Sequence, residues 1–182
     1  TYTMPIPSQR KYDARHIANI EKYANEVRAA YIKALKEVSK LSVGLSLNKN
    51  NEFYFRNNRG IDQLVNEVLE RMYQDVYGTT VSGIKAEWDL AVEKNNELAR
   101  YVFGVELKDL PVQIRDKYFT NNAAARRAFL TRKDGGLGLS SKVWRNTAQF
   151  KKELELSLEL GIGRGKSAQS IARESQQYLN DP

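Results

Sequence analysis

Few residues of this 182-residue chain have side chains whose type and spacing could support chemistry. There is no cysteine, which excludes a disulfide scaffold, Cys-ligated zinc, an iron–sulfur cluster and a thiol nucleophile. His16 is the single histidine, which argues against a Ser-His-Asp triad and against a histidine-based metal site. We therefore expect His16 to be exposed or lightly packed. We predict that the chain is not an enzyme and that it holds no metal and no cofactor.

Two pairs of carboxylates lie close in the sequence, Glu87 with Asp89 and Glu93 with Glu97. Residues four apart share a face of a helix, so Glu93 and Glu97 would be neighbours, whereas Glu87 and Asp89 would not. General acid–base catalysis needs a pocket that perturbs pKa values, and the surrounding sequence shows none. We interpret these carboxylates as part of a solvated helix face.

Residues 161–167 (Gly-Ile-Gly-Arg-Gly-Lys-Ser) partly match a phosphate-binding loop. That loop needs glycine at the position of Leu160 and follows a strand, whereas the preceding residues here have helical spacing. The sequence instead predicts that Gly161 and Gly163 end one helix, that Gly165 turns the chain and that Ser167 caps the next helix.

The elements that position these residues are predicted to be helices, which gives an all-α, multi-helix bundle. The clearest is a long N-terminal helix within residues 1–46, where nine residues alternate in steps of three and four: Ile17, Ile20, Ala24, Val27, Tyr31, Ala34, Val38, Leu41 and Leu45. This spacing places them on one stripe of a helix, as in coiled coils and helix bundles. We predict that Val27, Tyr31, Val38 and Leu41 contact a partner helix, which lies either in this chain or in a second copy of a homo-oligomer.

Residues 60–182 are predicted to form a helical body. Its first helix ends at Gly78, and a second helix begins within residues 79–82. A basic helix, a long helix capped by Ser140 and a short last helix complete it. The one short extended or β segment lies near residues 52–56, before this body.

The chain carries 29 Lys and Arg against 22 Asp and Glu, a formal net charge of +7. Basic residues flank a glycine-rich turn and would suit contact with the phosphates of double-stranded DNA: Arg126, Arg127, Arg132, Lys133, Lys142 and Arg145. The same residues would also suit a solvated or protein-binding face, since no helix-turn-helix or RNA-binding signature accompanies them. A basic helical nucleic-acid-binding protein is therefore the alternative function. No apolar run reaches the ~20 residues of a membrane span, so we expect no membrane partner.

Several short motifs follow one another in a distinctive order from residue 60 onward. The most specific stretch is 136–182, which contains Gly138-Leu-Ser-Ser-Lys-Val-Trp144, then residues 161–168, then Tyr178-Leu-Asn-Asp-Pro182. In this order the chain resembles the N-terminal part of phage minor head proteins of the Mu F-like head morphogenesis family, found in phages and prophages. The predicted N-terminal helix is similar to the family only in being a long helix at that place.

This resemblance implies a structural protein of the virion. Proteins of this family are low-copy head components that are associated with the portal vertex and linked to head assembly and to DNA packaging or delivery. The resemblance therefore implies the portal and other capsid proteins as partners, with packaged double-stranded DNA as a further one. It also implies location in the phage head, after assembly in the host cytoplasm.

Overall fold

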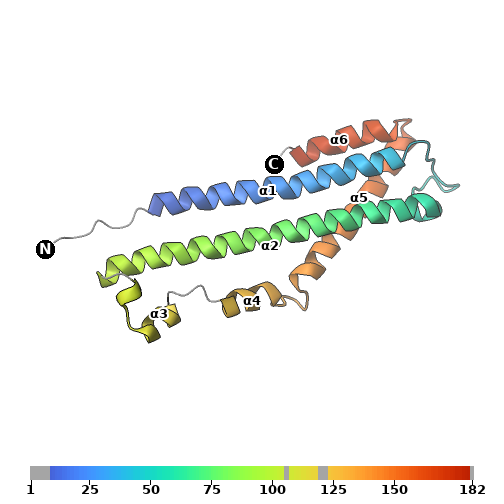
Figure 1. Ribbon diagram of the computed structural model, residues 1–182. Helices are drawn as coiled ribbons and strands as arrows, with labels where there is room; N and C mark the ends of the chain where they lie inside the picture. The colour runs from blue at the N-terminus through green and yellow to red at the C-terminus, as the bar shows by residue number, and fades with distance from the viewer. Residues whose placement is uncertain (1–8, 105–106, 119–122, 181–182) are drawn as a thin grey trace. The chain divides into compact units, whose positions relative to one another are not determined.

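In the computed structural model, which describes residues 9–104, 107–118 and 123–180, these ranges form six α-helices and no strand (Figure 1). The helices are α1 (Gln9–Leu41), α2 (Arg59–Phe103), α3 (Val112–Tyr118), α4 (Ala123–Thr131), α5 (Leu139–Gly163) and α6 (Ala168–Asn180). The predicted all-α class with a long N-terminal helix is confirmed.

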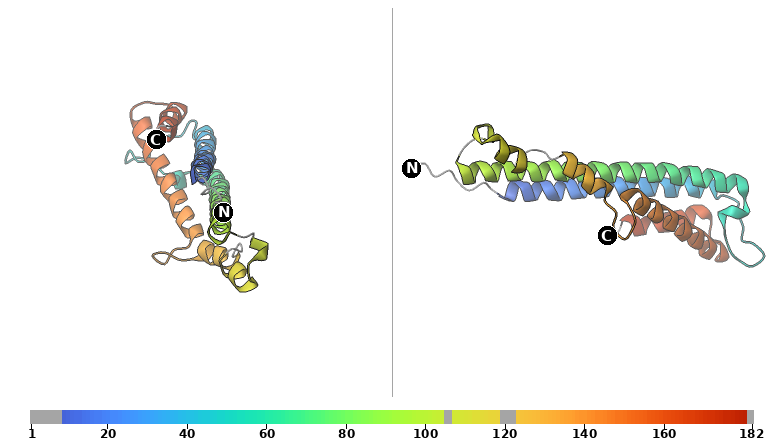
Figure 2. Two further views of the ribbon diagram at one scale, coloured as in Figure 1. Left: turned by 90° about the vertical axis from the view of Figure 1, so that its left-hand side faces the viewer. Right: turned by 90° about the horizontal axis from the view of Figure 1, so that it is seen from below.

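The chain packs as two compact units, each of which contains part of α1 and part of α2. Unit 1 comprises Thr1–Ala24 and Thr80–Arg132, and unit 2 comprises Asn25–Thr79 and Lys133–Pro182. In each unit the two helices run antiparallel, as the right-hand view of Figure 2 shows. The units thus divide the chain within both long helices, whereas the sequence suggested segments 1–46 and 60–182 on either side of the loop that joins the helices.

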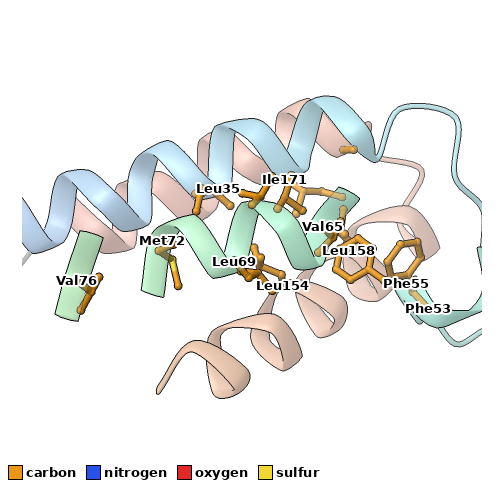
Figure 3. Packing of buried hydrophobic residues seen from close by; sticks show 14 of the residues in the cluster. Leu35, Phe53, Phe55, Val65, Leu69, Met72, Val76, Leu154, Leu158 and Ile171 are labelled. Atoms are coloured by element: carbon orange, nitrogen blue, oxygen red, sulfur yellow. The ribbon is translucent and has the colours of Figure 1, made fainter. Parts of the chain in front are cut away.

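The hydrophobic core lies in unit 2 (Figure 3). It is built from the apolar stripes of four helices and from two phenylalanines of the loop between α1 and α2: Ala34, Leu35, Val38, Phe53, Phe55, Val65, Val68, Leu69, Met72, Val76, Val143, Leu154, Leu158, Ala168 and Ile171. The spacing of three and four on α1, α2 and α5 turns these side chains toward one another, as their sequence pattern predicts.

The predicted extended segment is present without a partner strand. Residues 52–54 form neither helix nor strand, Tyr54 is extended (φ −137°, ψ 129°), and a short 3₁₀ turn follows at Phe55–Asn57. Two carboxylates of α5 accept backbone hydrogen bonds from this segment: the N–H of Phe53 donates to Glu159 Oε2 at 3.2 Å, and the N–H of Phe55 donates to Glu155 Oε1 at 3.1 Å. Side chains of a neighbouring helix therefore take the place of a second strand.

The predicted helix end at Gly78 is wrong, because α2 is one continuous helix of 45 residues. A glycine inside a helix costs only about 1 kcal/mol relative to alanine. Packing on both sides outweighs that cost: Val76 is buried in unit 2, and Gly83 lies against the Tyr23 ring in unit 1, where a Cβ would come within 3.2 Å of it. Residues 79–82 are accordingly helical and begin no new element.

The predicted cap of α5 is also displaced. The N-cap residue is Gly138, and Ser140 lies in the first turn of the helix. The Ser140 hydroxyl instead hydrogen-bonds the Tyr73 hydroxyl at 2.5 Å. Because a glycine in extended conformation can also cap a helix, Ser140 is free to bind a neighbouring helix.

Unit 1 has far less buried apolar surface. Its buried apolar side chains among the described residues are Tyr12, Leu90 and Ala99. The Trp88 and Phe129 rings lie 6.2 Å apart and connect α2 with α4. The pair α1–α2 in this unit must therefore depend on other contacts, which are described below.

Candidate interaction surfaces

The residues predicted to contact a partner helix find that partner in the same chain. Val38 is 1% exposed and belongs to the core of unit 2, while Val27, Tyr31 and Leu41 are partly buried against it. The Tyr31 ring meets the Phe150 ring of α5 edge-on, with 5.0 Å between the centroids. Burial raises the pKa of Tyr31. This part of the stripe is thus an internal packing surface of unit 2.

The same stripe is exposed where α1 enters unit 1. Ile17 is 55% exposed and Ile20 is 51% exposed. The residues of α1 that contact α2 here are displaced by one position from the stripe, at Tyr12, His16, Asn19 and Tyr23. One position corresponds to a rotation of about 100° around the helix. Ile17 and Ile20 therefore point to one side of the α1–α2 contact and not into it.

The predicted DNA-contacting residues fall into two sets, one in each unit. In unit 1, Arg126 pairs with Asp89 of α2 at 3.3 Å, and the Arg132 guanidinium lies 4.1 Å from the centroid of the Phe129 ring. Arg127 is exposed on the same helix, α4. Two of these three arginines thus already contact unit 1 itself.

In unit 2, Lys142 Nζ pairs with Asp134 Oδ2 at 2.7 Å, across the turn that precedes α5. Lys133 and Arg145 are exposed. Neither Lys133 nor Arg145 forms an ion pair with a side chain that the structure describes, and Lys152, further along α5, is likewise exposed.

An open groove of about 720 Å³ lies in unit 2 between the start of α2 and the middle of α5. Lys151 Nζ lies within it, 2.7 Å from Asp62 Oδ1 and 2.8 Å from Asn66 Oδ1. Leu69 and the half-exposed Trp144 form apolar parts of its wall. None of the predicted site residues lines the groove. Lys151, the cation within it, joins α5 to α2 inside unit 2.

The glycine-rich stretch 161–167 is a helix connection, as predicted. The N–H of Lys166 donates to the carbonyl of Gly161 at 2.9 Å, and the N–H of Gly165 donates to that of Ile162 at 2.9 Å. With Gly165 at φ +73°, these bonds form a Schellman motif at the end of α5. Ser167 Oγ then accepts the N–H of Ser170 at 3.2 Å and caps α6.

The lysine of this stretch has a structural contact. Lys166 Nζ lies 2.7 Å and 2.8 Å from the two carboxylate oxygens of Glu174 on α6. It thus fastens the connection to the helix that follows it.

Sequence reasoning missed the contacts of the carboxylates on α2. Lys11 Nζ lies 3.0 Å from Glu97, Arg15 Nη1 lies 2.7 Å from Glu93 Oε1, and the Tyr12 hydroxyl also donates to Glu97. The hydrogen bond from Arg15 lowers the pKa of Glu93, and those from Tyr12 and Lys11 lower the pKa of Glu97. The available signal was the matched spacing of four, at residues 11 and 15 and at 93 and 97, with opposite charges.

His16 belongs to the same row of contacts. Its Nδ1 lies 2.5 Å from Glu87 Oε2, and the Asn19 side-chain amide donates to Glu87 Oε1 at 2.8 Å. The His16 side chain is about half exposed, in agreement with the expectation from sequence.

Among the described residues, no group of three or more His, Cys, Asp and Glu side chains is placed to hold a metal ion. No helix in the same ranges is long and apolar enough to cross a membrane. Comparison of the chain with protein-family models, with curated proteins and with solved structures finds no match.

Proposed function

We propose that this chain is the N-terminal helical region of a phage minor head protein. It acts by protein–protein contacts at the portal region, in head assembly and in DNA packaging or delivery. The proposal starts from the sequence motifs of residues 136–182, whose described part, residues 136–180, comprises the turn before α5, α5 and α6. A structural role of this kind needs surfaces that dock on other proteins.

The outer face of α5 is the observation that carries the docking role. Leu156 and Leu160 are 49% and 52% exposed, whereas Leu154 and Leu158 of the same helix are buried. Residues four apart lie one above the other on a helix, so the two exposed leucines form one apolar strip. Such a strip supplies the anchors by which one helix docks into a groove of a partner.

Quantitative mass spectrometry on purified phage particles from the source strain tests the proposal. We expect peptides of this chain at a copy number far below that of the major capsid protein. Complete absence from otherwise intact particles would contradict a head component.

Variants of the same strip test the docking surface. Leu156→Asp with Leu160→Asp is expected to leave the helical circular dichroism spectrum unchanged and to reduce incorporation into particles. The matched control is Val43→Asp, at a side chain that is 60% exposed in the turn after α1. Equal incorporation of both variants would remove the assigned role of the α5 strip.

The alternative, a basic nucleic-acid-binding protein, is favoured by the exposure of Arg127, Arg132 and Arg145. Contacts between arginines and phosphates release counterions, so affinity for duplex DNA would fall steeply with salt, by a slope of about 0.9 per phosphate neutralised. Fluorescence anisotropy with a labelled duplex measures this slope. The absence of binding at ~50 mM salt would dismiss the alternative.

A further inference from the structure

The N-terminal part of α1, residues 9–24, is joined to α2 in a different way from the rest of the helix. We call these residues the arm. Apart from Tyr12 and the packing of the Tyr23 ring on Gly83, its contacts with α2 are ionic and polar, whereas residues 25–41 of α1 contribute Ala34, Leu35 and Val38 to the core of unit 2. The two parts of one helix are therefore held by different forces.

Basic residues of the arm face carboxylates of α2 along the whole contact. Lys11 forms an ion pair with Glu97 and Arg15 forms one with Glu93, while His16 Nδ1 lies within hydrogen-bond distance of Glu87. A further ion pair has the opposite polarity, with Asp13 of the arm 3.9 Å from Lys94 Nζ. Arg100 is the further cation beside Glu97.

These ion pairs are open to water. The exposed fractions of the paired side chains run from 31% for Glu97 to 66% for Asp13. Ion pairs at such positions contribute about 0–1 kcal/mol each and are weakened by salt.

Little apolar burial supports the arm. Tyr12 is its one buried apolar side chain among the described residues, and Ile17 and Ile20 remain exposed. On the opposite helix, the indole nitrogen of Trp88 and the amide oxygen of Asn96 are buried without a hydrogen-bond partner among the described residues. A buried polar group in that state costs about 1–3 kcal/mol, so unit 1 carries penalties that its small core does little to offset.

We propose that the arm is a salt-labile latch: at raised ionic strength residues 9–24 separate from α2 and lose their helical protection, while unit 2 stays folded. The arm is the N-terminal end of α1, and a helix end without tertiary contacts frays in water, so separation is accompanied by unwinding. Opening uncovers Tyr12 and the row of carboxylates on α2. This device concerns the opening of unit 1 and does not depend on the proposed role in the phage head.

Hydrogen–deuterium exchange on the full chain, followed by mass spectrometry, tests the latch between about 50 mM and 500 mM NaCl. The Debye length shortens from more than 10 Å to less than 8 Å over this range. We expect amide protection in residues 12–23 to fall at least about tenfold, with a change of less than about twofold in residues 30–41. Protection of residues 12–23 that does not change with the salt concentration would overturn the proposal.

Two variants separate the ionic contacts from a general effect of charge. Glu87→Gln with Glu93→Gln and Glu97→Gln is expected to expose residues 12–23 already at low salt. The matched control removes the same number of carboxylates at exposed positions outside the row of contacts, by Glu21→Gln, Glu26→Gln and Asp75→Asn. We expect the control to retain the wild-type exchange pattern, and an identical loss of protection in both would contradict the latch.

A third variant keeps the proposal testable if the first one unfolds unit 1 entirely. Arg15→Leu with Glu93→Leu replaces an exposed ion pair by an apolar pair, which salt does not screen. Residues 12–23 should then keep their protection at 500 mM NaCl to a greater degree than in the wild type. An unchanged salt dependence in this variant would show that the pair does not hold the arm.

Discussion

Gly161 has no Cβ, and this absence allows α5 and α6 to approach closely. A Cβ at this position would lie 2.1 Å from Cδ1 and 2.2 Å from Cγ1 of Ile171, which is a buried residue of the core of unit 2. Real Cβ atoms do not come that close to another carbon, so the isoleucine or the helix would have to move. The glycine read from sequence as a helix end thus has packing as its main role.

We therefore expect Gly161→Ala to destabilise the protein by about 1–3 kcal/mol, the usual cost of overpacking a core. The measurement is the free energy of unfolding in urea. Ile171→Val in the same chain removes Cδ1 and should recover part of this loss, because it takes away the atom in closest contact. Additive effects of the two changes would contradict a direct clash.

At the scale of elements, the long helix α2 shows what sequence reasoning can and cannot supply. The stripes on α2 and α5 that form the core were predictable because each lies on one helix and repeats every three or four residues. The continuity of α2 through Gly78 could not be predicted, because it depends on neighbours such as Tyr23 that are remote in sequence. Local propensity is a weak prior that tertiary packing overrides.

The sign of the stability change on substituting Gly78 shows whether this glycine lies inside a helix or ends one. No heavy atom lies within 4 Å of the position that a Cβ would occupy, and its φ is not positive. Gly78→Ala should therefore stabilise the protein by about 0.5–1 kcal/mol, since alanine loses less backbone entropy in a helix. A thermal or urea unfolding curve measures this change, and a clear loss of stability would show that the helix breaks there.

The helix pair of unit 1 should also be sensitive to acid. Interactions with Arg15, Tyr12 and Lys11 lower the pKa values of Glu93 and Glu97 below 4.5. Groups whose pKa is lower in the folded state stabilise it fully above the unfolded pKa, and this contribution disappears as the pH falls through the folded pKa. We therefore expect unit 1 to open below about pH 4.5, with the stabilising effect of these carboxylates intact at neutral pH.

The two tryptophans allow each unit to be followed separately. Trp88 lies in unit 1 and Trp144 in unit 2, so Trp144→Phe leaves a fluorescence reporter for unit 1 alone. The acid transition of Trp88 should shrink when Glu93→Gln and Glu97→Gln are added, and should persist in a control with Glu21→Gln. A transition of undiminished size in the first variant would assign the acid sensitivity to other groups.

Across the whole molecule, the apolar stripe that begins on α1 is buried in one part and exposed in another. The sequence pattern predicted a single apolar face from Ile17 to Leu45, and its second half is indeed buried or partly buried in unit 2. Its first half is exposed because the opposing part of α2 carries Glu87, Glu93 and Glu97 toward α1. The periodicity of one helix cannot reveal this, since the partner determines which of two adjacent faces is used.

The same substitution in the two halves of this stripe should therefore change the free energy of unfolding by very different amounts. Val38→Asp places a carboxylate in the core of unit 2, where Val38 is 1% exposed, and should cost at least about 3 kcal/mol of unfolding free energy. Ile17→Asp places it at a side chain that is 55% exposed and should change stability by no more than about 0.5 kcal/mol. Urea unfolding measures both, with Trp144 as the reporter of unit 2 for Val38→Asp and Trp88 as the reporter of unit 1 for Ile17→Asp. A large loss from Ile17→Asp would mean that this face is covered in solution, in which case a concentration-dependent effect would identify a second copy of the chain as the cover.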